Sequence, residues 1–277
     1  MMTMIRNSAR AAAAALVLLS TPALAKSSAD PEDAQPCETA MALSLLGPTM
    51  KAADNFLACA KVPGQKPFKI VQSRFRRLQQ LEAMKMRELA EAELVALTTP
   101  PLSTLPVFTN AASGNVILGG EESIGQTQVD LLAARAGYRL VAKDLPAALT
   151  FANRAIALAG YDPALLLDAA PAFAYRSRMA YAEKNTEVAV KMAVRAYARG
   201  SEDGFVQEII QSQDAGTQER LKQLRQYLKS EIGGYPYAIT AHARVTQKPE
   251  DLARQIKDAK TAAASLEQFE RTQLGPL

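Results

Sequence analysis

The sequence predicts an all-α protein, built as an array of helical hairpins with one long irregular segment around residues 98–126. Alanine is abundant, tryptophan is absent and runs of β-branched residues are few, which is a composition typical of helices. Apolar residues recur at three- and four-residue steps over most of the chain, which is the period of an amphipathic helix. Proline- and glycine-rich breaks separate these stretches and mark where the chain turns.

The beginning of the chain has the three parts of a cleavable export signal. Arg6 and Arg10 provide positive charge without an acidic residue nearby, and an apolar run at 11–19 follows. This run is too short to cross a bilayer about 30 Å thick as a helix. Small side chains then lead to a cleavage point after Ala25. We therefore expect residues 1–25 to be a signal peptide and the protein to be periplasmic or secreted; a membrane anchor or a disordered tail is the alternative.

The two cysteines of the chain, Cys37 and Cys59, predict a disulfide if the protein is exported. They lie about one helical hairpin apart, and Gly47-Pro48 sits near the midpoint, where the chain is expected to reverse. A bridge between two short antiparallel helices fits this spacing. Free thiols or metal-bound thiols remain the alternatives.

The remaining chain divides into four parts. We expect a flexible lead-in at residues 26–36, an N-terminal helical region with the disulfide hairpin at 37–97, an irregular linker or lid at 98–126, and a helical repeat-like domain at 127–277. Within the second part, the apolar spacing predicts one long helix from about Pro67 to Leu97.

The helical pattern is most regular between Thr127 and Arg199. Turns are expected at Lys143-Asp144 and at Lys184-Asn185, which makes two successive hairpins. Asp162-Pro163 is expected to begin the first helix of the second hairpin, and Pro171 to kink or split it. The second helix of each hairpin carries alanine at matching places, namely Ala148, Ala152 and Ala155 in one and Ala189, Ala193 and Ala196 in the other.

This arrangement resembles tetratricopeptide repeats, in which small residues of the second helix pack against the first. The resemblance covers residues 127–199 only, and lysine stands where the family has its turn glycine. The spacing from Ala148 to Ala189 is also longer than the family period of about 34 residues. Generic helical hairpins pack alanine for the same geometric reason, which is the competing explanation. The resemblance implies a solenoid whose first helices line a groove for a partner peptide.

Four residues are candidate binding residues if the resemblance holds: Arg135, Arg139, Arg178 and Tyr181. The family's groove arginines clamp carboxylates of a bound peptide. Aligned by their alanines, the two hairpins direct Arg178 and Tyr181 toward the groove and Arg135 and Arg139 toward the packing side. The alternative is that all four are ordinary surface side chains with buried aliphatic stems.

No catalytic set is recognisable in the sequence. His242 is the single histidine, which excludes two-histidine metal sites and leaves no histidine-based triad with a typical nucleophile motif. We expect no metal site and no cofactor. Without residues 1–25 the chain has 30 basic and 28 acidic residues, a net charge of +2 that gives no support for nucleic-acid binding. No later stretch is long and apolar enough to predict a membrane span.

These observations favour a periplasmic helical-repeat scaffold that binds a protein or peptide partner in the cell envelope and performs no chemistry. Two alternatives remain. One is an envelope enzyme or small-ligand-binding protein that uses residues 98–126 as a lid, and the other is a structural component of the envelope.

Overall fold

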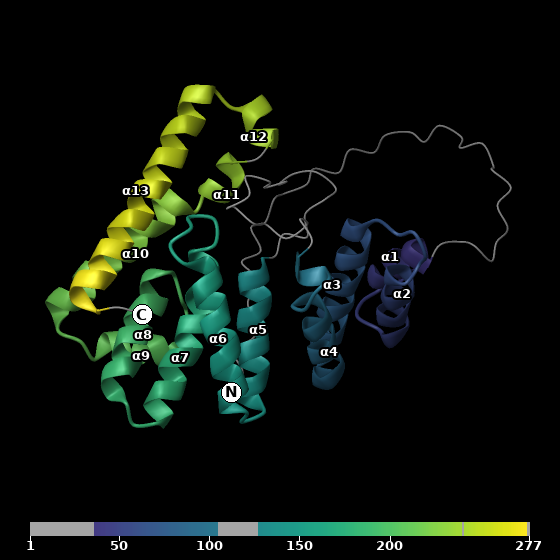
Figure 1. Cartoon of the computed structure of the whole chain (residues 1–277), viewed down its shortest axis with the longest axis horizontal. Coiled ribbons are helices and arrows are strands. Elements are labelled where there is room, and N and C mark those ends of the chain that lie inside the picture. The colour runs from purple at the N-terminus through teal and green to yellow at the C-terminus, as the bar shows by residue number, and fades with distance from the viewer. Residues whose placement is uncertain (1–35, 105–126, 240, 276–277) are drawn as a thin grey trace, which may run out of the picture.

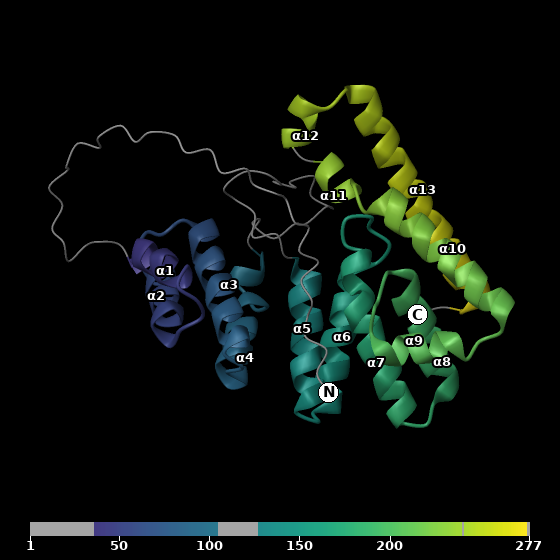
Figure 2. The ribbon, with the colours of Figure 1, turned by 180° about the vertical axis from the view of Figure 1, so that it is seen from behind.

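The computed structural model describes residues 36–104, 127–239 and 241–275 (Figures 1 and 2). The predicted signal peptide, nearly all of the lead-in and residues 105–126 lie outside this part of the chain. The described residues form helices and no strand, so the all-α prediction is confirmed. The elements are α1 (Pro36–Ser44), α2 (Met50–Ala60), α3 (Pro67–Ala83), α4 (Arg87–Leu97), η2 (Leu102–Thr104), α5 (Gln128–Val141), α6 (Leu145–Ala159), η4 (Leu167–Ala169), α7 (Ala170–Ala182), α8 (Thr186–Ala198), α9 (Gly204–Gln211), α10 (Ala215–Ile232), α11 (Tyr235–Ala238), α12 (Ala241–Thr246) and α13 (Pro249–Gln273).

Consecutive helices pair into hairpins that stand side by side along the long axis of the molecule (Figures 1 and 2). The pairs are α1 with α2, α3 with α4, α5 with α6, and α7 with α8, and they are followed by the longer pair α10 and α13. Helix α5 joins the two halves, because Leu131 and Tyr138 pack into the core of the α3–α4 hairpin while Leu132 and Ala136 belong to the core of the following hairpins. The prediction of a helical-hairpin array is therefore confirmed.

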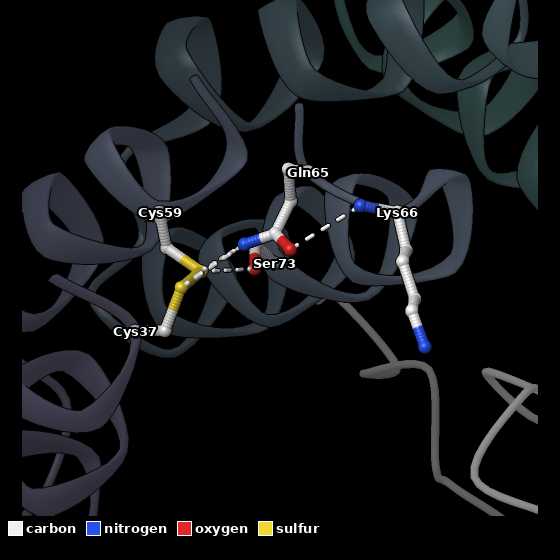
Figure 3. The surroundings of a disulfide bond; sticks show 5 residues. All are labelled: Cys37, Cys59, Gln65, Lys66 and Ser73. Carbon is white, nitrogen blue, oxygen red and sulfur yellow. Dashed lines mark hydrogen bonds between the residues drawn. A yellow bond between two sulfur atoms is a disulfide. The ribbon is translucent and has the colours of Figure 1, made fainter. Parts of the chain in front are cut away.

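The predicted disulfide between Cys37 and Cys59 is present and joins α1 to α2 (Figure 3). The Ser73 hydroxyl of α3 lies 3.0 Å from the Cys59 sulfur, and the Gln65 side-chain amide lies 3.4 Å from the Cys37 sulfur. The bridge is thus held against the next hairpin as well as within its own. Among the described residues, no helix has the length and apolar character needed to cross a membrane.

Three of the hairpins share one turn, built around a lysine with positive φ. Lys85, Lys143 and Lys184 have φ values of 61°, 62° and 61°. In each turn, the N–H of the residue after the lysine bonds the carbonyl five residues earlier, as in Met86 to Leu81 at 2.9 Å. This is the Schellman closure of a helix end, which places its left-handed residue where glycine is usual. The expected turns at Lys143 and Lys184 are confirmed.

The expected single helix from Pro67 to Leu97 is wrong, because the turn at Lys85 divides it into α3 and α4. Asp144 and Asn185 cap the next helix with their side chains in the other two turns, whereas Met86 has no oxygen to do so. The turn at Lys85 therefore has no glycine, proline or capping side chain from which the sequence could predict it.

The second helices of the three hairpins bury small or apolar residues at the same distances from the turn lysine. At the fifth, ninth and twelfth positions after it, every side chain has no exposed surface: Ala90, Leu94 and Leu97; Ala148, Ala152 and Ala155; and Ala189, Ala193 and Ala196. The hairpin α3–α4 is therefore a third unit of the same design, outside the range in which the sequence showed a regular pattern.

The expected helix start at Asp162-Pro163 is also wrong. Asp162 caps a turn, where its side chain accepts a bond of 2.9 Å from the Ala164 N–H, and the chain then passes through η4. Helix α7 begins only at Ala170, so Pro171 lies in its first turn and causes no kink. Proline is well tolerated at this position because its missing N–H would have no partner inside the helix.

Helix α13 runs diagonally across the end of the array, alongside α10 (Figure 1). Its apolar face, with Ala262, Ala263 and Leu266, packs on Leu228 of α10 and Ala198 of α8. Helix α13 therefore covers the end of the array.

Replacing a turn lysine with glycine is expected to stabilise the protein. The left-handed conformation costs a side-chain-bearing residue about 1–2 kcal/mol, and the greater freedom of glycine in the unfolded chain offsets part of this gain. Lys143→Gly and Lys184→Gly should each raise the free energy of unfolding by about 0.5–1 kcal/mol in urea denaturation. Lys184→Ala is the control, because alanine keeps the strain; equal effects of the two Lys184 variants would contradict the explanation.

Loss of the disulfide is expected to destabilise the N-terminal hairpin. The bridge closes a loop of 22 residues, which corresponds to about 3 kcal/mol in the chain-entropy description. Thermal unfolding of the Cys37→Ser, Cys59→Ser double variant should therefore begin at a lower temperature than that of the oxidised protein. Reducing agent should produce the same shift in the wild type and none in the variant. Coincident curves for oxidised and reduced wild type would refute this expectation.

Candidate functional site

Tyr181, on α7, is an exposed aromatic residue that lies close to the candidate residue Arg178. Tyr181 is 55% exposed, and its ring meets that of Phe205 edge-on, with 5.2 Å between centroids. Arg178 lies one turn earlier, and its guanidinium stands 5.1 Å from the centre of the Phe205 ring. Together with Tyr175 and Asp203, these residues form what we call the α7–α9 surface.

Local capping holds the α7–α9 surface in place. Asp203 is the N-cap of α9 and accepts hydrogen bonds from the N–H groups of Phe205 and Val206. The same carboxylate binds Nη2 of Arg178 at 2.8 and 2.9 Å. One aspartate therefore orients both the arginine and the helix that carries the aromatic ring.

Tyr175 anchors the other edge of this surface to α5. Its hydroxyl lies close to Gly137, where an added Cβ would be 2.7 Å from the Tyr175 oxygen. Only glycine permits this approach. Burial raises the pKa of Tyr175, and the nearby Asp203 carboxylate raises it further.

The α7–α9 surface can bind a partner through two kinds of contact. The exposed face of Tyr181 offers apolar area with a polar hydroxyl at its edge. The Arg178 side chain is 40% exposed, and its bonds to Asp203 use Nη2 alone. Its other guanidinium nitrogens are left for an acceptor on a partner.

Arg135 and Arg139 lie elsewhere, at the contacts that α5 makes with its neighbours. Arg135 donates to the Thr98 hydroxyl at 3.0 Å and covers the Phe151 ring at 3.9 Å. Arg139 pairs with Glu91 of α4 at 2.5 Å and with Asp144 at 3.5 Å.

The four candidate binding residues thus form two separate pairs. Burial lowers the pKa of Arg135, and the charges of Arg139 and Arg154 lower it further, as expected for a residue on the packing side. Arg178 and Tyr181, by contrast, lie on an open surface.

The remaining sequence candidates are His242 and the 98–126 segment proposed as a lid. The His242 side chain lies outside the described part of the structure, as does most of that segment. Within the described ranges, no three histidine, cysteine or acidic side chains are grouped so that they could hold a metal ion. A hollow lies at the α3–α4 turn, lined by Lys85, Met86, Arg87, Glu88 and Leu89.

A pair of partly buried carboxylates, Asp130 and Asp168, was not predicted from the sequence. Thr127 bridges them, since its hydroxyl donates to Asp168 at 2.9 Å and its N–H donates to Asp130 at 3.2 Å. Thr127 and Asp130 form a capping box at the start of α5, a pattern that the sequence displays. Asp168 comes from η4, 41 residues away from Thr127, and nothing in the local pattern announces it.

The two carboxylates titrate far above the usual range. Burial raises the pKa of Asp130 to about 6, against the lowering effect of its bonds to Thr127. Burial raises the pKa of Asp168 to about 8, and the charge of Asp130 contributes to this rise. Near neutral pH the pair therefore retains a proton, because two adjacent, partly buried carboxylates resist becoming charged together.

The chain matches no protein family, no curated protein and no solved structure. Of the arrangements described, the α7–α9 surface is the one whose aromatic and basic groups are both held in place and open to solvent.

The acid pair Asp130 and Asp168 is expected to make the free energy of unfolding fall as pH rises. Both pKa values are higher in the folded state, so the folded state holds more protons than the unfolded state. The stability that these protons provide is lost as the pH rises past the folded-state pKa values of about 6 and 8. Asp168→Asn keeps an oxygen that accepts from Thr127 but removes the charge. It should raise the free energy of unfolding by about 1–3 kcal/mol at pH 9, and by little at pH 4.

Urea denaturation across this pH range measures the effect. Glu208→Gln is the control, since Glu208 is an exposed carboxylate of α9. A gain for Asp168→Asn that is the same at pH 4 and pH 9 would show that the charge of Asp168 is not responsible.

Proposed function

We propose that this protein is a periplasmic helical-repeat scaffold that binds a protein or peptide partner through the α7–α9 surface. The observation that carries the proposal is the exposed Tyr181 ring beside an arginine that Asp203 has already oriented. Binding, rather than catalysis, is the role that this arrangement suits.

The residue types support an interface. Tyrosine and arginine are enriched among the residues that contribute most to protein–protein binding. Asp203 and Phe205 restrict Arg178 and Tyr181 before a partner arrives, so that less conformational entropy is lost on binding. A row of stacked hairpins also provides a long surface along which a peptide can extend.

The proposed compartment follows from the start of the chain and from the disulfide. The arrangement of Arg6, Arg10, the apolar run and Ala25 is that of an export signal. Disulfides such as Cys37–Cys59 persist mainly in oxidising compartments, of which the periplasm is one.

Site-specific photo-crosslinking in the cell tests the proposal. A photoreactive phenylalanine analogue at position 181 should give a discrete crosslinked product with a partner. The same analogue at Tyr227 of α10, which is 39% exposed, is the matched control and should give none. Equal products at both positions, or none at either, would contradict the proposed surface.

Once the partner is identified, Arg178→Ala and Tyr181→Ala should each weaken the binding of that partner at least about tenfold, since each removes a central contact. Circular dichroism should show that both variants keep their helices. A crosslink between two copies of this chain would instead favour the structural role in the envelope.

A further inference from the structure

The two ends of the Cys37–Cys59 disulfide have different surroundings (Figure 3). Cys59 is 2% exposed and belongs to the buried face of α2, whereas Cys37, in the first turn of α1, is partly exposed. A thiolate from solution therefore has easier access to the bridge from the side of Cys37. This difference is important because the rate of thiol–disulfide exchange depends on which sulfur is attacked.

The buried sulfur is also the better leaving group. The Ser73 hydroxyl donates a hydrogen bond to Sγ of Cys59 at 3.0 Å, and Ser73 is only 4% exposed. The Gln65 amide reaches both sulfurs, at 3.4 Å from Cys37 and 4.0 Å from Cys59, so Ser73 is the donor that distinguishes them. A donor held against a sulfur stabilises the negative charge that this sulfur acquires when the bond breaks. Exchange is faster when the leaving thiolate is more stable.

Little besides the bridge holds α1 in place. Helix α1 has nine residues and packs mainly on α2, and Ala40 is its one fully buried residue. Helices shorter than about 12–15 residues are marginally stable when isolated. Opening of the disulfide is therefore expected to let α1 separate from α2.

We propose that Cys37–Cys59 is an exchangeable disulfide, which a dithiol reductant opens by attacking Cys37, and that its opening releases α1. The chain has no third cysteine, so the attacking thiolate comes from another molecule. The bridge lies in the first hairpin and the α7–α9 surface lies further along the array, so neither proposal depends on the other (Figure 1).

The exchange has two steps. In the first, a thiolate of the reductant forms a bond to Sγ of Cys37, the bond between the two cysteines breaks, and Cys59 leaves with the electron pair as a thiolate that Ser73 stabilises. In the second, the other thiolate of the reductant attacks the reductant's own sulfur in the mixed disulfide, and Cys37 leaves as a thiolate. The reductant is oxidised to its disulfide, and the two cysteines receive two electrons and take up protons from water.

Glutathione, which carries a single thiol, tests which sulfur is attacked, because the first step leaves it bound to that sulfur. The folded, oxidised protein is treated with reduced glutathione and quenched with acid, and the free thiols are then alkylated. Peptide mass spectrometry should find glutathione on Cys37 and the alkyl group on Cys59. Glutathione on Cys59, equal amounts on both cysteines, or an adduct that forms only in denaturant would overturn the proposal.

Ser73→Ala tests the part played by the hydroxyl. Loss of the donor should slow the opening of the bridge by dithiothreitol several-fold, because Cys59 then leaves as a less stable thiolate. Ser230→Ala is the control and should react like the wild type, since Ser230 is an exposed serine of α10. If Ser73 only supported the packing of the hairpin, its loss would loosen the hairpin and make the reaction faster. An unchanged or faster rate for Ser73→Ala would therefore contradict the role of Cys59 as the stabilised leaving group.

Hydrogen exchange measures the release of α1. Reduction of the wild type with dithiothreitol should remove the protection of the α1 amides and leave that of α7 and α8 unchanged. The Cys37→Ser, Cys59→Ser double variant is the control, and its α1 amides should be unprotected with or without the reductant. Protection that persists in α1 after both thiols are free would overturn the release of this helix.

Discussion

The close packing of each hairpin's second helix on its first is the constraint on which the rest of the structure depends. The Schellman turn at Lys85, Lys143 or Lys184 sets where the chain reverses. The fully buried positions at fixed distances after that lysine then let the two helices approach. Because alanine occupies most of these positions, the helices come close without the voids that larger, poorly fitted side chains would leave. Similar hairpins can then stack side by side.

Buried charges determine how the ends of this stack are joined. In the N-terminal half, Glu93 ties α4 to the arginines of α3, and the disulfide holds α1 and α2 together. At the other end, Glu270 ties α13 to α8. Such contacts are costly to form and more costly to break singly, because the remaining partner would stay buried and unpaired. They therefore favour one arrangement of the helices over others that bury similar apolar area.

The errors in the sequence prediction have identifiable physical causes. The apolar spacing continues from α3 into α4, and Met86 offers no capping oxygen, so the turn at Lys85 resembles helix. Asp162 was expected to cap a helix, and it does accept a backbone N–H, but it does so in a turn. Aspartate stabilises both structures through the same bond, and only the packing of the following residues distinguishes them.

The sequence by itself determined the helical class, the hairpins after Thr127 and the pairing of Cys37 with Cys59, because these depend on short-range spacing and on a single possible cysteine pair. Only the tertiary structure decided which polar groups meet. Thr127 and Asp168 are 41 residues apart, Arg178 and Asp203 are 25 apart, and Arg195 and Glu270 are 75 apart. Such pairs depend on how one hairpin is placed against the next, which residue spacing within a helix does not encode. The exposed surface at Tyr181 and the buried pairing of Arg195 with Glu270 are both products of that placement.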